Sequence, residues 1–187
     1  MRVIGGTYSK RPLKTLSSQL TRPTSDKVKE SLFNSLGQYF DGGIALDLYG
    51  GSGALAIESV SRGMDKAVVV DKAYQAVKII KENVAMTKEE AKFEVLKMPD
   101  TAALKKLATD GYQFDYVFLD PPYAKQQIAT IMSELVKLNL LADSATIIAE
   151  TDKDTEVVAE EDNYRLIKEK KYGQTMVRIF QYERVSQ

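Results

Sequence analysis

The chain of 187 residues contains no cysteine and no histidine. These two absences exclude thiol and imidazole nucleophiles, histidine general bases and the usual zinc sites. They also exclude methylation of cytosine C5 through a cysteine adduct. Any chemistry must therefore use carboxylates, backbone groups, hydroxyls or a bound cofactor, and we expect no metal centre.

Long apolar runs are missing as well, both a membrane-spanning stretch and the apolar core of a signal peptide. A chain without disulfides fits the reducing cytoplasm, and we expect a cytoplasmic monomer. With 44% apolar and 28% charged residues, residues 1–187 are expected to fold as a single domain. Within it we expect a basic arm and helix over 1–40 and a core over 41–187.

The net charge is zero, but the charges are unevenly distributed. Residues 1–29 contain seven basic side chains and one acidic side chain, whereas residues 143–162 contain eight acidic side chains and one lysine. A basic arm on a neutral protein indicates contact with a polyanion, because each neutralised phosphate releases condensed counterions. A solvated surface strand without a ligand is the alternative.

The sequence of the first 40 residues predicts an extended arm followed by a helix. Residues 1–22 are typical of a short β-hairpin or extended arm with a bend at Gly5-Gly6. Pro23 favours an extended residue before it, and Thr24 or Ser25 can cap a helix that runs to about Phe40. Gly42-Gly43 is expected to stop this helix.

Strands and helices alternate through the rest of the chain. Apolar runs predict strands at 44–48, 66–71, 93–96, 116–119 and 146–149, and periodicity predicts helices at 53–62, 73–86, 101–108 and 125–138. Residues 164–171 and 175–182 predict a terminal antiparallel hairpin. The order predicts a Rossmann-like α/β fold with a mostly parallel seven-stranded sheet, whose ligands bind at the carboxyl ends of the strands.

A glycine-rich turn, Asp47-Leu48-Tyr49-Gly50-Gly51-Ser52-Gly53, follows the first central strand. Its glycines let backbone amides approach a ligand closely, although ordinary strand-to-helix turns use glycine too. The next strand ends at Asp71, twenty residues after Gly51, which is the spacing of a carboxylate that binds ribose hydroxyls. Asp47 before the turn suits a cationic ligand better than a pyrophosphate. S-adenosylmethionine, with its ammonium, sulfonium and ribose diol, matches these two carboxylates.

Further cofactor contacts are expected near these carboxylates. Asp100 follows the third strand and could accept a hydrogen bond from the adenine amino group, with helix capping as the alternative. The full set of expected cofactor-binding residues is Asp47, Tyr49, Gly50, Gly51, Gly53, Asp71, Lys72 and Asp100.

Asp120-Pro121-Pro122-Tyr123 follows the apolar run 116–119, where the chain leaves the sheet. Two prolines remove backbone donors and make a stiff turn. A carboxylate and free carbonyls beside an aromatic ring can accept hydrogen bonds from an amino group while a planar base stacks. The pattern indicates methylation of an exocyclic nitrogen with Asp120, Pro121 and Tyr123 as catalytic residues, and an ordinary strand-to-loop turn is the alternative.

The chain resembles the RsmD-type family of bacterial 16S rRNA (guanine-N2)-methyltransferases over essentially its whole length. The resembling segments are 2–6, 21–34, 47–55 with Glu58, 61–63 and 120–123. The amino-terminal block is the specific part, because the other segments recur across amino-methyltransferases. The resemblance implies the class I S-adenosylmethionine-dependent fold, a guanine of the position-966 type as target, and 16S rRNA or the assembling 30S subunit as partner.

In this interpretation the basic arm and residues 22–29 hold phosphates beside the reacting base. The expected RNA contacts are Lys10, Arg11, Lys14, Arg22, Thr24 and Lys27. Three alternatives stay open: an amino-methyltransferase acting on adenine N6 or on glutamine, a non-catalytic RNA-binding or assembly protein, and a nicotinamide oxidoreductase. The absent dinucleotide spacing and the Pro-Pro turn disfavour the last, and 187 residues leave no room for the added recognition domain typical of DNA enzymes.

Overall fold

The computed structural model describes residues 1–16, 26–121, 124–159 and 163–184. The chain forms two compact units, Met1–Pro99 and Asp100–Gln187. Each unit is built from strands with helices packed against them, so the α/β class predicted from the alternating pattern is confirmed.

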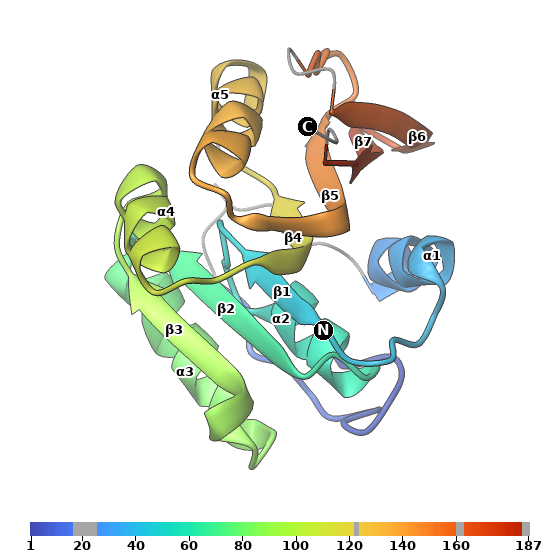
Figure 1. The fold of residues 1–187 in the computed structure, drawn as a ribbon. Helices are drawn as coiled ribbons and strands as arrows, with labels where there is room; N and C mark the ends of the chain where they lie inside the picture. Colours follow the sequence, from blue (N-terminus) through green and yellow to red (C-terminus); the bar gives the residue numbers. More distant parts are fainter. Residues whose placement is uncertain (17–25, 122–123, 160–162, 185–187) are drawn as a thin grey trace. The chain divides into compact units, whose positions relative to one another are not determined.

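The first unit holds three parallel strands in the order β3-β2-β1. Its elements are α1 (Asp26–Leu36), β1 (Ile44–Asp47), α2 (Ala54–Ser61), β2 (Lys66–Asp71), α3 (Tyr74–Met86), a 3-10 turn (Glu90–Lys92) and β3 (Phe93–Lys97). Figure 1 shows α2 and α3 on one face of these strands. The central strand β2 buries all four residues from Ala67 to Val70, because a parallel strand is covered on both faces.

The N-terminal arm forms a hairpin-like loop, as predicted. Arg2 and Pro12 make an antiparallel bridge. Val3 N donates to Arg11 O at 3.0 Å, and Leu13 N donates to Met1 O at 2.9 Å. Pro12 donates no backbone hydrogen bond, which limits the pairing to this short contact. Residues 17–22 of the predicted arm lie outside the described residues.

Helix α1 ends earlier than predicted. It stops at Leu36, not near Phe40, because Gly37 and Gln38 adopt left-handed φ angles of 115° and 66°. Glycine takes this conformation at little cost and commonly terminates helices. The prediction that Gly42-Gly43 stops the helix is therefore wrong.

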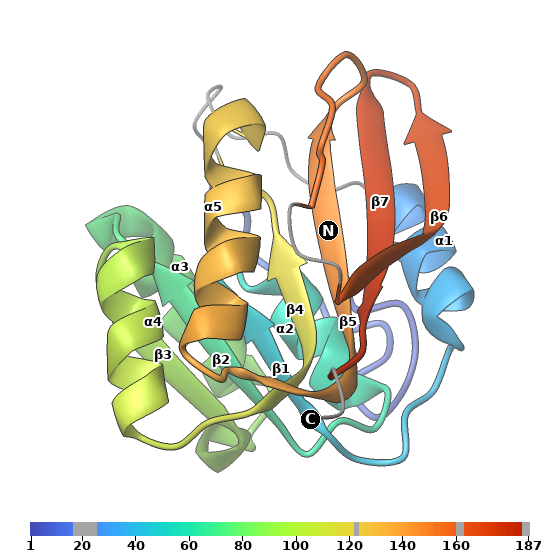
Figure 2. The same ribbon diagram turned by 45° about the horizontal axis from the view of Figure 1, so that its top comes forward.

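The second unit places two parallel strands beside an antiparallel hairpin, in the order β4-β5-β7-β6. Its elements are α4 (Asp100–Thr109), β4 (Phe114–Leu119), α5 (Ala124–Lys137), β5 (Leu141–Asp152), β6 (Tyr164–Tyr172) and β7 (Thr175–Tyr182). Figure 2 shows β6 at the outer edge, beside β7. The predicted terminal hairpin is confirmed.

Strand β5 is longer than the predicted 146–149 and extends to Asp152. Its additional carboxyl-terminal residues pair with β7, down to Asp152 opposite Thr175. Pairing with a partner strand satisfies the backbone groups of polar residues, which hydrophobicity alone does not reveal.

Among the described residues, no helix is long and apolar enough to cross a membrane.

Candidate cofactor and active site

The glycine turn after β1 is a tightly bonded loop. Gly50 N donates to Val70 O at 2.7 Å, and Gly53 N donates to Gly50 O at 2.8 Å. A Cβ on Gly50 would lie 2.5 Å from Val69 Cγ1, so glycine is required for this close approach. Gly51 has φ 59°, and a Cβ there would meet no atom within 4 Å. Gly53 also has positive φ and lies directly before α2.

Asp71 connects this turn to the following helix. Its Oδ2 accepts a hydrogen bond from Gly51 N at 3.0 Å, and its Oδ1 accepts one from Ala73 N at 2.9 Å. Each carboxylate oxygen has further lone-pair capacity, so both can still accept a bond from a hydroxyl. The carboxylate is thus fixed in orientation and stays half-buried at the carboxyl end of β2.

Asp47 lies at the carboxyl end of the neighbouring strand. In the parallel register Asp47 stands opposite Val69, which places Asp71 two residues further along β2. The Asp47 side chain is buried, with 3% exposure. Tyr49 after it is half-buried, and Lys72 after Asp71 is exposed. Two predicted carboxylates and the glycine turn therefore meet at one sheet edge of the first unit.

Asn83 on α3 was not foreseen from the sequence. Its Nδ2 donates to Ser52 O at 2.8 Å and to Lys14 O at 2.9 Å, while its Oδ1 accepts from Lys14 N at 2.8 Å. Asn83 therefore ties the N-terminal arm to the glycine turn. The sequence contained a signal for this role: Asn83 interrupts the apolar face formed by Val77, Ile80 and Val84, and a buried amide needs hydrogen-bond partners.

Asp120 directly follows β4 and is exposed, whereas Pro121 is buried. Pro122 and Tyr123 lie outside the described residues. The predicted carboxylate thus sits at the carboxyl end of a strand that pairs in parallel with β5. Asp100 opens α4, and its Oδ1 accepts from Thr101 N at 2.7 Å. This bond satisfies one backbone donor at the start of α4, and both the helix-capping role and the adenine contact of Asp100 stay predictions.

The basic residues of the arm differ in their surroundings. Lys10 is exposed, as is Lys14, whose Nζ lies 3.1 Å from Glu82. Arg11 is committed to the fold: its Nη1 donates to Met86 O and to Thr87 O, both at 3.3 Å. A guanidinium at the end of a helix satisfies carbonyls that lack intrahelical partners. Lys27 is exposed, and the predicted contacts Arg22 and Thr24 lie outside the described residues.

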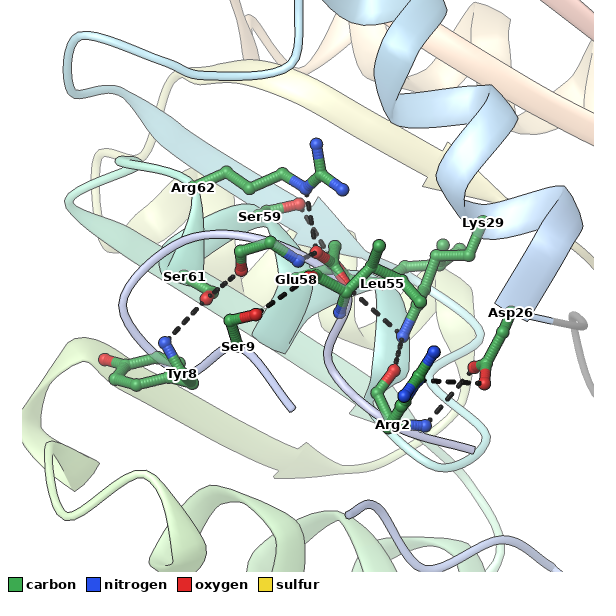
Figure 3. Close-up of polar contacts among 12 residues, drawn as sticks. Arg2, Tyr8, Ser9, Asp26, Lys29, Leu55, Glu58, Ser59, Ser61 and Arg62 are labelled. Carbon is green, nitrogen blue, oxygen red and sulfur yellow. Dashed lines mark hydrogen bonds and ion pairs between the residues drawn. The ribbon is translucent and has the colours of Figure 1, made fainter. Parts of the chain in front are cut away.

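A buried charged cluster joins the arm, α1 and α2 (Figure 3). Glu58 of α2 is fully buried. Its Oε1 accepts from Ile4 N at 2.9 Å and lies 3.1 Å from Lys29 Nζ. Its Oε2 accepts from Gly5 N at 3.0 Å and from Arg62 Nε at 2.7 Å. Four donors therefore surround one carboxylate, and two of them are backbone groups of the arm.

Lys29 belongs to this cluster and not to the surface. Its side chain has 0% exposure, and its Nζ donates to Arg2 O at 2.6 Å. The expectation that residues 22–29 hold phosphates is therefore wrong for Lys29. Burial lowers the pKa of the Lys29 amine, against the opposing attraction of Glu58. For Glu58 burial alone would raise the pKa, but the bonds from Ile4, Arg62 and Gly5 together lower it.

The charge of Glu58 is conspicuous in the sequence, but most of the groups that bind it are not. Helix α2, Ala54–Ser61, buries all but one of its eight residues. A carboxylate in so apolar a segment needs compensation. Lys29 and Ile4 lie 29 and 54 positions away in the chain, so only folding reveals them, whereas Arg62 is four positions away.

Known proteins resemble this chain over nearly its whole length. A "Putative rRNA methyltransferase YlbH" from Bacillus subtilis (strain 168) is 37% identical over 180 residues, which cover 96% of this chain and 98% of that protein. A "Ribosomal RNA small subunit methyltransferase D" from Haemophilus influenzae is 35% identical over 182 residues, 97% of this chain and 93% of the relative. The solved "Putative methyltransferase yhhF from Escherichia coli" has a TM-score of 0.86 at 29% identity, covering 99% of both chains.

The fold and these relatives therefore define a protein of the Rossmann-like methyltransferase class, as predicted. The family described as "Conserved hypothetical protein 95" matches residues 1–181, and this chain belongs to it. The resemblance to the RsmD-type family is thereby confirmed.

Proposed function

We propose that this protein transfers a methyl group from S-adenosylmethionine to the exocyclic N2 of one guanine in 16S rRNA, a guanine of the position-966 type. The observation that carries the proposal is the Asp71 carboxylate, which is held by Gly51 N and Ala73 N at the edge that also bears Asp47. The relatives named as rRNA methyltransferases support rRNA as the substrate. We expect a cytoplasmic monomer acting on rRNA or on the assembling 30S subunit.

The residues at this edge fit the cofactor. The fixed Asp71 carboxylate retains acceptor capacity for two ribose hydroxyls. Asp47 places a buried carboxyl group at the end of β1, which suits a ligand bearing an ammonium and a sulfonium. Beside Gly51 the space is open, so that its backbone can lie against a ligand. Gly50, by contrast, serves packing against Val69.

Bound S-adenosylmethionine supplies an electrophilic methyl group. Guanine N2 is a poor nucleophile, because its lone pair is delocalised into the ring. The Asp120 carboxylate and the Pro121 carbonyl would accept hydrogen bonds from the two N2 protons, which localises the lone pair and stabilises the developing positive charge. Tyr123 would stack on the base after it has left its own stack. Holding the reactants in line can supply roughly 7–11 kcal/mol of the barrier reduction.

The decisive experiment maps the product. The protein is incubated with labelled S-adenosylmethionine and small ribosomal subunits from a strain that lacks it, and the modified nucleotide is identified. We expect one N2-methylguanine in 16S rRNA. A label on adenine N6 or on protein would replace this proposal with another amino-methyltransferase activity. Cofactor binding by calorimetry without any transfer would favour a non-catalytic RNA-binding role.

Asp71→Ala should weaken cofactor binding by about 1–3 kcal/mol, because hydrogen bonds to a charged acceptor are lost. Isothermal titration calorimetry with S-adenosylhomocysteine measures this change. Asp65→Ala is the matched control: Asp65 lies at the amino end of the same strand and also accepts a backbone hydrogen bond, from Gly43 N at 3.0 Å. Equal affinities of the two variants would show that Asp71 does not bind the ribose.

Replacing Lys10 and Lys14 together by alanine should weaken RNA association and flatten its salt dependence. If each lysine neutralises one phosphate of a single strand, the slope of log K against log salt falls by about 1.4. Arg11 is left intact, because its guanidinium bonds to Met86 O and Thr87 O and its loss would disturb the fold. Filter binding between 50 and 200 mM salt, with calorimetry of the cofactor in parallel, tests this. An unaltered slope would indicate that the arm is a solvated surface loop that does not bind RNA.

A further inference from the structure

The edge strand β6 carries three of its four positive charges on one face. Residues directly opposite each other in an antiparallel pair share a face, and alternate residues of one strand share a face. The bulge between Leu166 and Lys168 shifts the register by one, which places Arg165 on the same face as the lysines beyond it. We call this set the basic face of β6: Arg165, Lys168, Lys170 and Tyr172, opposite Gln181, Ile179, Val177 and Thr175 of β7.

The other face of β6 has a different character. It bears Glu169, which lies opposite Arg178, with Oε2 2.9 Å from Arg178 Nε. It also bears Tyr164, whose hydroxyl donates to Met132 O on α5 at 2.8 Å. Lys171 is the remaining cation of the strand and lies on this second face, opposite Met176. The only carboxylate of β6 therefore faces away from the basic face.

The basic face is accessible and includes an aromatic ring. Arg165, Lys168 and Lys170 are exposed, and Lys170 Nζ lies 5.1 Å from the centre of the Tyr172 ring. A cation held over an aromatic ring beside a second lysine is a typical pairing for a nucleic-acid strand, because phosphates contact the amines and a base can stack on the ring.

Carboxylates lie at the borders of the basic face. Arg165 Nη2 lies 3.7 Å from Glu183 Oε1 and donates to Gln181 Oε1 at 3.0 Å. Glu150 and Asp152 of β5 lie opposite Val177 and Thr175, so they share this side of the sheet two strands inward. The cations of β6 therefore attract a polyanion to the edge strand, and the carboxylates of β5 repel it from the inner strands.

The strand register connects the basic face to Asp120. Leu119, Ala149, Arg178 and Glu169 form one row across the four strands of this unit. Asp120 follows Leu119 and Lys170 follows Glu169, so they occupy the next row at the same end of the sheet. Three strand spacings separate them, ~14 Å. That span is within reach of a few extended nucleotides.

We propose that the basic face of β6 binds the RNA backbone next to the target guanine, with phosphates at Lys168 and Lys170 and a flanking base on Tyr172. The assignment rests on the proposed rRNA function. The ordinary role of lysines on an edge strand is to prevent pairing with other sheets. Protection of the edge needs charge on the strand but not on one particular face. Variants that remove lysines from one face or the other therefore distinguish edge protection from RNA binding.

The test compares the double variant Lys168→Gln/Lys170→Gln with the single variant Lys171→Gln, which removes a lysine from the opposite face of the same strand. Binding of a 16S rRNA fragment is measured against salt in the presence of S-adenosylhomocysteine. We expect the log–log salt slope to fall by about 1.4 in the double variant, the contribution of two single-strand phosphates. Lys171→Gln should keep the wild-type slope. Tyr172→Ala should weaken binding about 5- to 150-fold, whereas Tyr172→Phe should match the wild type.

A wild-type slope in the double variant, or an equal fall in Lys171→Gln, overturns the proposal and leaves edge protection as the role of these lysines. Thermal midpoints and cofactor affinity are measured in the same variants, so that a folding defect is recognised. Methyl transfer by the wild type is assayed separately. If the wild type binds RNA through this face but does not methylate guanine N2, the interface stands and the proposed activity fails. If it methylates and the slope is unchanged, only the interface fails.

Discussion

Asp120→Ala should lose at least about a hundredfold in the single-turnover rate of methyl transfer, the scale observed when one preorganised electrostatic partner is removed. The carboxylate lies after β4, at the end where parallel strands present their ligands. Its proposed role is to accept a hydrogen bond from an N2 proton and to stabilise the positive charge that develops on the amine. Because Asp120 is exposed, its removal opens no cavity and should leave the thermal midpoint close to that of the wild type.

Rapid-quench measurement with saturating RNA isolates the chemical step, and calorimetry shows whether cofactor affinity is retained. Asp120→Asn keeps a carbonyl acceptor but loses the negative charge, so its rate should lie between those of the alanine variant and the wild type. Asp115→Asn is the matched control, because Asp115 lies near the amino end of the same strand and should react at the wild-type rate. Wild-type turnover in Asp120→Ala would refute the proposed role of this carboxylate.

Glu58→Gln should lower the free energy of unfolding by about 3–5 kcal/mol, because it leaves Lys29 and Arg62 buried without their counter-ion. Both cations are at most 5% exposed, so water cannot replace the lost carboxylate. The same change removes the charge that holds Ile4 N and Gly5 N, and it should loosen the arm. Urea denaturation measures the loss, and hydrogen exchange of the two amides measures the loosening. Asp110→Asn breaks an exposed pair with Lys106 and should cost no more than about 1 kcal/mol.

The cluster also predicts how stability depends on pH. The pKa of Glu58 lies below its ordinary value of 4.5, so the unfolded chain binds more protons and stability rises with pH in this range. The contribution of Glu58 is complete above pH 4.5 and is lost as the pH falls through the folded-state pKa. The wild type should therefore lose more stability in acid than Glu58→Gln does. If the wild type and Glu58→Gln lost the same amount of stability as the pH falls, this assignment would be contradicted.

The sequence by itself determined the order of strands and helices and the positions of the acidic residues at the strand ends. Asp47, Asp71 and Asp120 each follow an apolar run of strand length. Because local sequence signals mark where such a strand ends, they also place the residue that follows at the carboxyl edge of the sheet. The hairpin of β6 and β7 was likewise predictable, because alternation around Gly173 is a local pattern. The end of α1 was predicted wrongly because both Gly37 and Gly42-Gly43 could terminate the helix, and the helix ends at Gly37.

The tertiary structure alone decided which charges are used inside the protein and which remain at its surface. Lys29, Arg11 and Lys10 look equivalent in the sequence, yet the first is buried against Glu58, the second bonds to the end of α3, and the third is exposed. The face of β6 on which Arg165 lies also depends on a bulge that no local pattern specifies. The physical reason is the same in both cases. The free energy of a charged side chain depends on its desolvation and on partners distant in the chain, and both are fixed only when the chain folds.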